Sequence, residues 1–158
     1  MDYLWTPWRY RYITEAAPEP GCVFCRIVAS NDDEANLVVH RGERNFIVLN
    51  RYPYTSGHAM VTPFEHTATL EALDEAAAQE MMRLTQRLET AVRKVYRPEG
   101  VNIGMNIGKA AGAGIADHIH MHVLPRWTAD NNFATVIGET RVLPEELSVT
   151  WKRLRSEF

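Results

Sequence analysis

The segment 117–126 of this chain contains three histidines at strict alternation: His118, His120 and His122. Apolar residues separate them, and in an extended strand successive side chains point to opposite faces of the sheet. The three imidazoles are therefore predicted to share one face, about 6.6 Å apart along the strand. Imidazole can act as a nucleophile, a proton carrier or a metal ligand, so this face is the first candidate for chemistry.

Three interpretations of this face are open. It could be a polar strand surface, a metal site built on the strand alone, or a nucleophilic imidazole that its neighbours support and that acts on phosphorus. The stretch 104–114, directly upstream, contains four glycines, which permit positive φ angles and bring backbone N–H groups close to an anion. A glycine-rich loop directly before the histidines favours the third interpretation.

The two cysteines of the chain stand close together as Cys22-Val-Phe-Cys25. In a reducing compartment such a pair suggests zinc binding or redox chemistry, and a structural zinc site needs two further ligands. The candidates are His40, His58, His66 and the three alternating histidines. No βαβ pattern surrounds the pair, which disfavours a thioredoxin-like role, and two unconnected buried thiols are the alternative.

The composition is that of an ordinary globular domain, with 158 residues, 46% hydrophobic and 23% charged, and a formal net charge of −3. This length predicts one domain over 1–158, and the acidic balance argues against a nucleic-acid partner. No apolar run approaches the roughly 18 residues that span a membrane. The N-terminus lacks the layout of a signal peptide, so we expect a cytoplasmic protein with no membrane partner.

The elements that must position these residues follow from hydrophobic periodicity. Besides the histidine strand, strands are predicted at 37–40, 45–50, 58–62 and 101–107. Between 67 and 97 the period is helical, with an apolar stripe formed by Met81, Leu84, Leu88, Val92 and Val95. Asp74 is the predicted N-cap, and Pro98 with Gly100 ends this helix.

Antiparallel strands with one long helix across a face predict an α+β domain. The residues 1–20 are rich in Trp and Tyr and are expected to form an N-terminal arm packed on the body. The residues 131–158 form a C-terminal extension with a shorter, charged helix that begins after Pro144.

The sequence resembles a known family. The segment 118–124 matches the His-φ-His-φ-His-φ-φ signature of the histidine triad (HIT) superfamily of nucleotide hydrolases and transferases. The segments 46–63 and 98–104 resemble that family's first hairpin and the strand that enters its phosphate loop. The segments 4–9 and 125–127 look more narrowly like bacterial diadenosine tetraphosphate phosphorylases of the family.

The resemblance implies a HIT-like fold and a catalytic role for four histidines. His120 matches the nucleophile, which attacks the α-phosphorus of a nucleotide and forms a nucleotidyl-imidazole intermediate. His122 would donate to the phosphoryl or leaving oxygens, and His58 matches the family's fourth histidine. His118 would either hold zinc or orient His120.

Zinc is the cofactor that the resemblance implies. In the zinc-bearing branch of the family the ligands carry over to Cys22, Cys25, His66 and His118, and the site would be structural.

The resemblance also implies nucleotide contacts. Asn50 matches a residue that contacts ribose, and the loop residues expected around the phosphates are Asn106, Gly108, Lys109, Gly112, Gly114 and Ile115. Trp127 could stack on a base or simply pack against Trp5 and Trp8. Hydrolases of the family carry glutamine at the position of Gly114, so the glycine favours a phosphorylase, in which small residues leave space for incoming phosphate.

Taken as a whole, the resemblance implies an enzyme that cleaves an adenosine dinucleoside polyphosphate at the α-phosphate, with inorganic phosphate as acceptor. The alternatives are a hydrolase of adenosine phosphoramidates and a nucleotide-binding module with little turnover. An adenine mono- or dinucleotide is the expected partner, and the family resemblance implies a homodimer.

Overall fold

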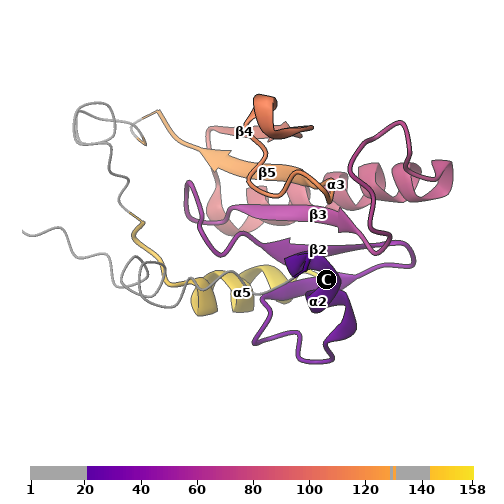
Figure 1. Ribbon diagram of the computed structural model, residues 1–158. Helices are drawn as coiled ribbons and strands as arrows, with labels where there is room; N and C mark the ends of the chain where they lie inside the picture. The colour runs from indigo at the N-terminus through magenta and orange to yellow at the C-terminus, as the bar shows by residue number, and fades with distance from the viewer. Residues whose placement is uncertain (1–20, 129, 131–142) are drawn as a thin grey trace, which may run out of the picture.

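The computed structural model describes residues 21–128, 130 and 143–158 and shows one antiparallel sheet of five strands in the order β1-β2-β3-β5-β4 (Figure 1). In chain order the elements are α2 (Val23–Ala29), β1 (Val38–Arg41), β2 (Asn45–Leu49), β3 (Ala59–Pro63), α3 (Glu75–Tyr96), β4 (Gly100–Gly104), the 3₁₀ turn η1 (Lys109–Ala111), β5 (Met121–Arg126) and α5 (Leu147–Arg155). The α+β architecture is as predicted. The predicted arm, residues 1–20, and part of the predicted extension lie outside the described residues.

The long helix α3 covers one face of the sheet, as its apolar stripe predicted. Met81, Leu84 and Leu88 are buried in the main core cluster with Met121 and Val123 of β5. The side chain of Asp74 accepts a hydrogen bond from the backbone N–H of Ala77, which makes it the N-cap as expected. The segment from 67 to Asp74 is not helical.

The histidine strand is shorter than predicted, because β5 begins only at Met121. Strand β3 pairs with β5 from Ala59 to Val61 and no further, so His118 and His120 precede the ladder. The backbone N–H of Ile119 donates instead to the carbonyl of Thr67, in the loop after β3. The alternation of faces survives, since Met121 and Val123 enter the core on the α3 side.

The helix α5 protects the edge strand β1. The indole N–H of Trp151 donates to the carbonyl of Val38 at 2.8 Å, and Arg155 donates to the carbonyl of Val39 at 2.5 Å. An exposed edge strand can pair with a strand of another molecule, and these two side chains cover the edge of the sheet at β1. Within the described part of the chain, no helix combines the length and apolarity needed to cross a membrane.

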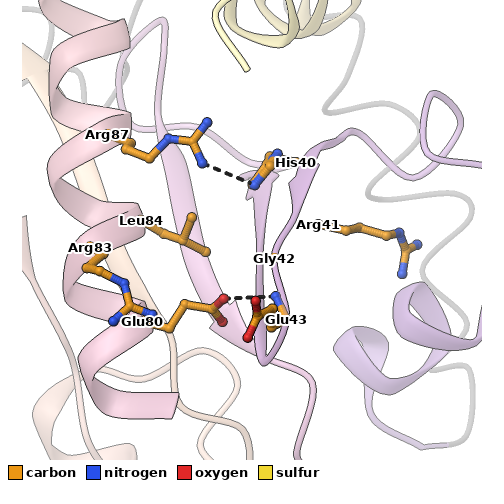
Figure 2. Close-up of a pocket in the computed structure, with 8 residues that line it drawn as sticks. All are labelled: His40, Arg41, Gly42, Glu43, Glu80, Arg83, Leu84 and Arg87. Atoms are coloured by element: carbon orange, nitrogen blue, oxygen red, sulfur yellow. Dashed lines mark hydrogen bonds between the residues drawn. The ribbon is translucent and has the colours of Figure 1, made fainter. Parts of the chain in front are cut away.

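A buried carboxylate joins α3 to the turn between β1 and β2 (Figure 2). Glu80, only 6% exposed, accepts hydrogen bonds from the backbone N–H groups of Glu43 at 2.8 Å and Arg44 at 2.7 Å, and from the Asn45 amide at 2.9 Å. A Cβ on Gly42 would lie 2.8 Å from the Glu80 carboxylate, so glycine allows this close approach. Burial alone would raise the pKa of Glu80, but these hydrogen bonds outweigh it and lower the pKa.

Replacing Glu80 by Gln is expected to lower the free energy of unfolding by about 1–3 kcal/mol at neutral pH, because donors that face a carboxylate would then face an amide. Since the folded pKa lies below the unfolded value, the carboxylate's contribution is complete above the unfolded pKa and disappears as pH falls through the folded pKa. Denaturant titrations at a series of pH values should therefore show the difference from wild type shrinking in acid. The exposed Glu75→Gln on the same helix is the control, and a difference that is independent of pH would contradict the account.

Candidate functional site

His118 is fully buried, and both of its ring nitrogens have defined neighbours. The Nε2–H donates to the carbonyl of Pro63 at 2.9 Å, which leaves Nδ1 with its lone pair. That Nδ1 lies 3.3 Å from the sulfur of Cys22 and 3.8 Å from the sulfur of Cys25. Burial lowers the pKa of His118, so the ring is held in a neutral, metal-binding form.

His66 completes a cluster of four possible metal ligands. Its Nδ1 lies 3.3 Å from the Cys25 sulfur, and one ligand atom from each of the four residues falls within 4.8 Å of all the others. In a tetrahedral zinc site neighbouring sulfur and nitrogen ligands stand about 3.3–3.8 Å apart. The donor set and its spacing fit zinc, and the structure brings together all four residues that the resemblance implied.

The cluster joins three distant parts of the chain: the start of α2, the loop after β3 and the segment before β5. Burial and the neighbouring Cys22 raise the pKa of the Cys25 thiol. The Cys25 thiol therefore resists ionisation by itself, whereas a bound divalent cation would favour its thiolate.

His120 is held by a hydrogen bond at one ring nitrogen. Its Nδ1–H donates to the main-chain carbonyl of His118 at 2.8 Å, so the lone pair is on Nε2. Burial lowers the pKa of His120, although the hydrogen bond to His118 opposes this effect. A buried, neutral imidazole with an unprotonated Nε2 has the form that a nucleophile requires.

His58 and His122 form a hydrogen-bonded chain that begins at the backbone of Tyr54. The Tyr54 N–H donates to His58 Nδ1 at 3.1 Å, so the proton of a neutral His58 must be on Nε2. That Nε2 lies 2.9 Å from His122 Nδ1, which accepts, so His122 carries its own proton on Nε2. Burial, with a smaller effect of His120, lowers the pKa of His122 to about 4.

The rings of His120 and His122 are adjacent, with centroids 4.8 Å apart. The first presents a lone pair and the second a donor, both from Nε2. This pairing of a nucleophile with a neutral hydrogen-bond donor suits attack on a phosphoryl group whose oxygens need stabilising.

A tight turn at Gly57 positions His58 in the hydrogen-bonded series that links Tyr54, His58 and His122. Gly57 has a φ of 82°, and a Cβ there would lie 2.8 Å from the Tyr96 ring and 3.1 Å from Pro125. Only glycine accommodates both the backbone conformation and this close approach. Asn50, the predicted ribose contact, lies nearby, with its amide nitrogen 3.5 Å from His58 Nε2 and its oxygen accepting from Tyr52 N–H.

The loop between β4 and the histidines contains the predicted phosphate contacts. Gly108 and Gly112 have positive φ angles of 82° and 90°, as a tight anion-binding loop requires. Lys109 is exposed, Asn106 lines a hollow beside His122, and Ile115 packs on the apolar cluster around Phe24. A Cβ added to Gly114 would meet no atom within 4 Å.

Trp127 is half-buried and follows the last residue of β5. It stands five residues beyond His122, or roughly 16 Å along an extended strand. The structure therefore places it at the far end of the strand from His120. The predicted alternative contacts, Trp5 and Trp8, lie outside the described residues.

Two aromatic residues contact the histidines, although the sequence did not predict either contact. The ring of Phe24, between the two cysteines, lies 5.2 Å from the rings of both His118 and His120. The ring of Tyr54 stands 4.9 Å from that of His58 and 6.3 Å from that of His122. Phe24 belongs to the Cys22–Cys25 pair and Tyr54 to the segment 46–63 that resembles the family's hairpin. Their spacing alone does not indicate contact with a strand so distant in sequence.

His40, one of the candidate metal ligands, is half-buried. Its ring lies 5.0 Å from that of Phe158, and Arg87 contacts it at 3.4 Å from Nη1 to Nε2. It lines a hollow of about 430 Å³ between α3 and the β1–β2 turn, on the side seen in Figure 2. His40 is not part of the metal-ligand cluster.

Comparison with known proteins agrees with this geometry. Residues 31–129 match the HIT domain family. A Mycobacterium tuberculosis protein named AP-4-A phosphorylase is 40% identical, over 100% of this chain and 85% of that protein. A crystal structure of a zinc-bound histidine triad family protein from Mycobacterium smegmatis has a TM-score of 0.71 and 31% identity, over 87% of this chain and 92% of that one.

An uncharacterized HIT-like protein of Saccharolobus solfataricus is 31% identical over 69% of this chain and 76% of its own length. This chain belongs to the HIT domain family. It is, more particularly, a nucleotide-processing enzyme of that family, which confirms the resemblance, the fold and the enzymatic class expected from the sequence.

Nitrogen-15 NMR of the histidine rings is expected to show His120 protonated on Nδ1 and His122 on Nε2, both neutral at pH 7, because burial lowers both pKa values. His122 should titrate near pH 4. In His58→Phe the acceptor Nδ1 of His122 loses its donor, so the preference for the Nε2–H form should weaken. Titration of wild-type His122 at the ordinary histidine value, or the opposite tautomer, would contradict this assignment.

Proposed function

We propose that the chain transfers a nucleotidyl group from an adenosine dinucleoside polyphosphate to inorganic phosphate through a covalent bond to His120. The observation that carries this proposal is the complementary pair of ring nitrogens, an unprotonated Nε2 on His120 beside a protonated Nε2 on His122. The full-length similarity to the M. tuberculosis AP-4-A phosphorylase supports the choice of substrate and acceptor.

In the first step the His120 Nε2 lone pair attacks the α-phosphorus, a P–N bond forms, and the bond from phosphorus to the bridging oxygen breaks. The leaving polyphosphate takes the bonding electrons, and the His122 Nε2–H stabilises the charge that develops on oxygen. The Nδ1–H bond to the His118 carbonyl stabilises the positive charge that the His120 ring acquires.

In the second step an oxygen of inorganic phosphate attacks the same phosphorus, and the P–N bond breaks. Diadenosine tetraphosphate would thus give ATP in the first step and ADP in the second. The open space around Gly114 leaves room for the acceptor, and the exposed Lys109 offers a positive charge at the loop.

His120→Gly is expected to abolish turnover of diadenosine tetraphosphate and to leave nucleotide binding largely intact, because this residue alone forms the covalent bond. Chromatography of the wild-type products, with and without phosphate, checks the reaction. ADP with ATP indicates phosphorolysis, whereas AMP with ATP, or two ADP, indicates hydrolysis and would overturn the proposed acceptor. Wild-type activity in His120→Gly would overturn the nucleophile.

We further propose that Cys22, Cys25, His66 and His118 hold one structural zinc ion. Four protein ligands leave no open position, so zinc would supply folding energy rather than take part in a reaction step. The donor spacing and the zinc-bound relative from M. smegmatis support this assignment.

Elemental analysis should find about one zinc ion per chain. Chelation should lower the melting temperature of the wild type, while Cys22→Ser with Cys25→Ser should lose the metal and become insensitive to chelator. Zinc retained after both cysteines are replaced would exclude this ligand set.

Trp127 is proposed to contact the distant nucleoside of a dinucleotide, since it lies too far along β5 to reach the α-phosphate. Trp127→Ala should raise KM for a dinucleotide more than for a mononucleotide, by about 1–3 kcal/mol for a lost base stack. Equal losses for both substrates, or a lower melting temperature with unchanged KM, would show that Trp127 only packs.

A further inference from the structure

A hollow of about 190 Å³ opens beside His122, between β4, β5 and the loop before β3. Its lining combines an aromatic and an apolar side chain with two amides and the His122 ring: Tyr54, Leu124, Asn102, Asn106 and His122. Flat apolar surface with a few hydrogen-bonding groups is the composition that binds a nucleoside base.

The hollow lies on one particular side of the histidine pair. Phe24 packs against His120, whereas Tyr54 packs against His58 and His122. In a phosphoryl displacement the attacking and leaving atoms are roughly in line, on opposite sides of phosphorus. A leaving group that departs from His120 toward the donor of His122 therefore passes into the hollow.

Tyr54 offers this leaving group an aromatic surface. Its side chain is 47% exposed, although its ring also contacts the rings of His58 and His122. Leu124 of β5 lines the same hollow and is half-buried, whereas the side chain of Ile103 lies on the opposite face of the sheet, because Ile103 pairs with Val123. Exposed apolar groups gathered at a hollow mark a binding surface rather than a core.

The polar edge of the hollow is arranged by Arg126. Its Nη1 donates to the Asn102 Oδ1 at 2.9 Å, and its other nitrogens donate to the Asp130 carboxylate. With its oxygen engaged in this way, the Asn102 amide is oriented and its N–H groups are available to an acceptor in the hollow.

We infer that Tyr54 and Leu124 form the binding site for the nucleoside of the leaving polyphosphate, with Asn102 at the edge of its base. This inference rests on the proposed transfer through His120 and adds the specificity for a substrate with two nucleosides.

The test compares diadenosine tetraphosphate with adenosine tetraphosphate, which lacks the second nucleoside. In Tyr54→Ala the ratio of the two KM values, dinucleotide over mononucleotide, is expected to rise about tenfold, the usual strength of one base stack. Tyr54→Ala keeps the backbone N–H that donates to His58, so the histidine chain is preserved. Tyr54→Phe, which keeps the ring, should leave the ratio at the wild-type value.

Tyr52→Ala is the matched control, because Tyr52 is 45% exposed in the same loop but does not line the hollow. It should leave the KM ratio unchanged. An unchanged ratio in Tyr54→Ala, or an equal rise in Tyr52→Ala, would overturn the inference.

Calorimetry on the His120→Gly protein separates this inference from the reaction itself. Tighter binding of the dinucleotide than of adenosine tetraphosphate, with the difference lost on adding Tyr54→Ala, supports the site even where turnover fails. Equal affinities for both nucleotides with Tyr54 intact would overturn it.

Discussion

The candidate active site depends on His118, a residue that holds three other parts of the molecule in place at once. Its Nε2–H binds the end of β3 at Pro63, its Nδ1 faces the cysteine sulfurs, and its main-chain carbonyl accepts from the Nδ1–H of His120. The bond to Pro63 fixes the tautomer of the His118 ring, and the bond from His120 fixes the tautomer of the His120 ring. The tautomer of His120, the proposed nucleophile, is thus set by the same residue that completes the cluster with Cys22, Cys25 and His66.

This arrangement couples folding to chemistry. The cluster connects α2 to the segment before β5, and Phe24, between the cysteines, contacts the rings of His118 and His120. On the opposite side of the main chain, Met121 and Val123 anchor β5 in the core beneath α3. The histidines are therefore held from both sides, which is the rigidity that a covalent mechanism needs.

Periodicity was enough to predict the α+β class, the long helix with its Asp74 cap and the common face of the histidines, because these depend on local spacing. It placed the start of the histidine strand too early, because His118 bonds to Pro63 through its side chain and the neighbouring backbone bonds to Thr67. The number of histidines and cysteines suggested a metal, but only the resemblance selected His66 over His40 and His58.

Other features depend on contacts between distant parts of the chain, and no local pattern reveals them. Tyr54 meets His122 only because its loop folds onto β5, where Thr55 binds the carbonyl of Pro125. Glu80 is one of three glutamates in α3, and its role becomes visible only when N–H donors of Glu43, Arg44 and Asn45 converge on it.

The central claim is that His120 carries the nucleotidyl group between the two half-reactions. Rapid mixing with diadenosine tetraphosphate in the absence of phosphate, an alkaline quench that preserves the P–N bond, and peptide mass spectrometry test it directly. The account predicts one AMP group attached to the peptide that contains His120, localised to that ring by fragmentation. Substrate consumption with no adduct, or an adduct on another residue, would contradict it.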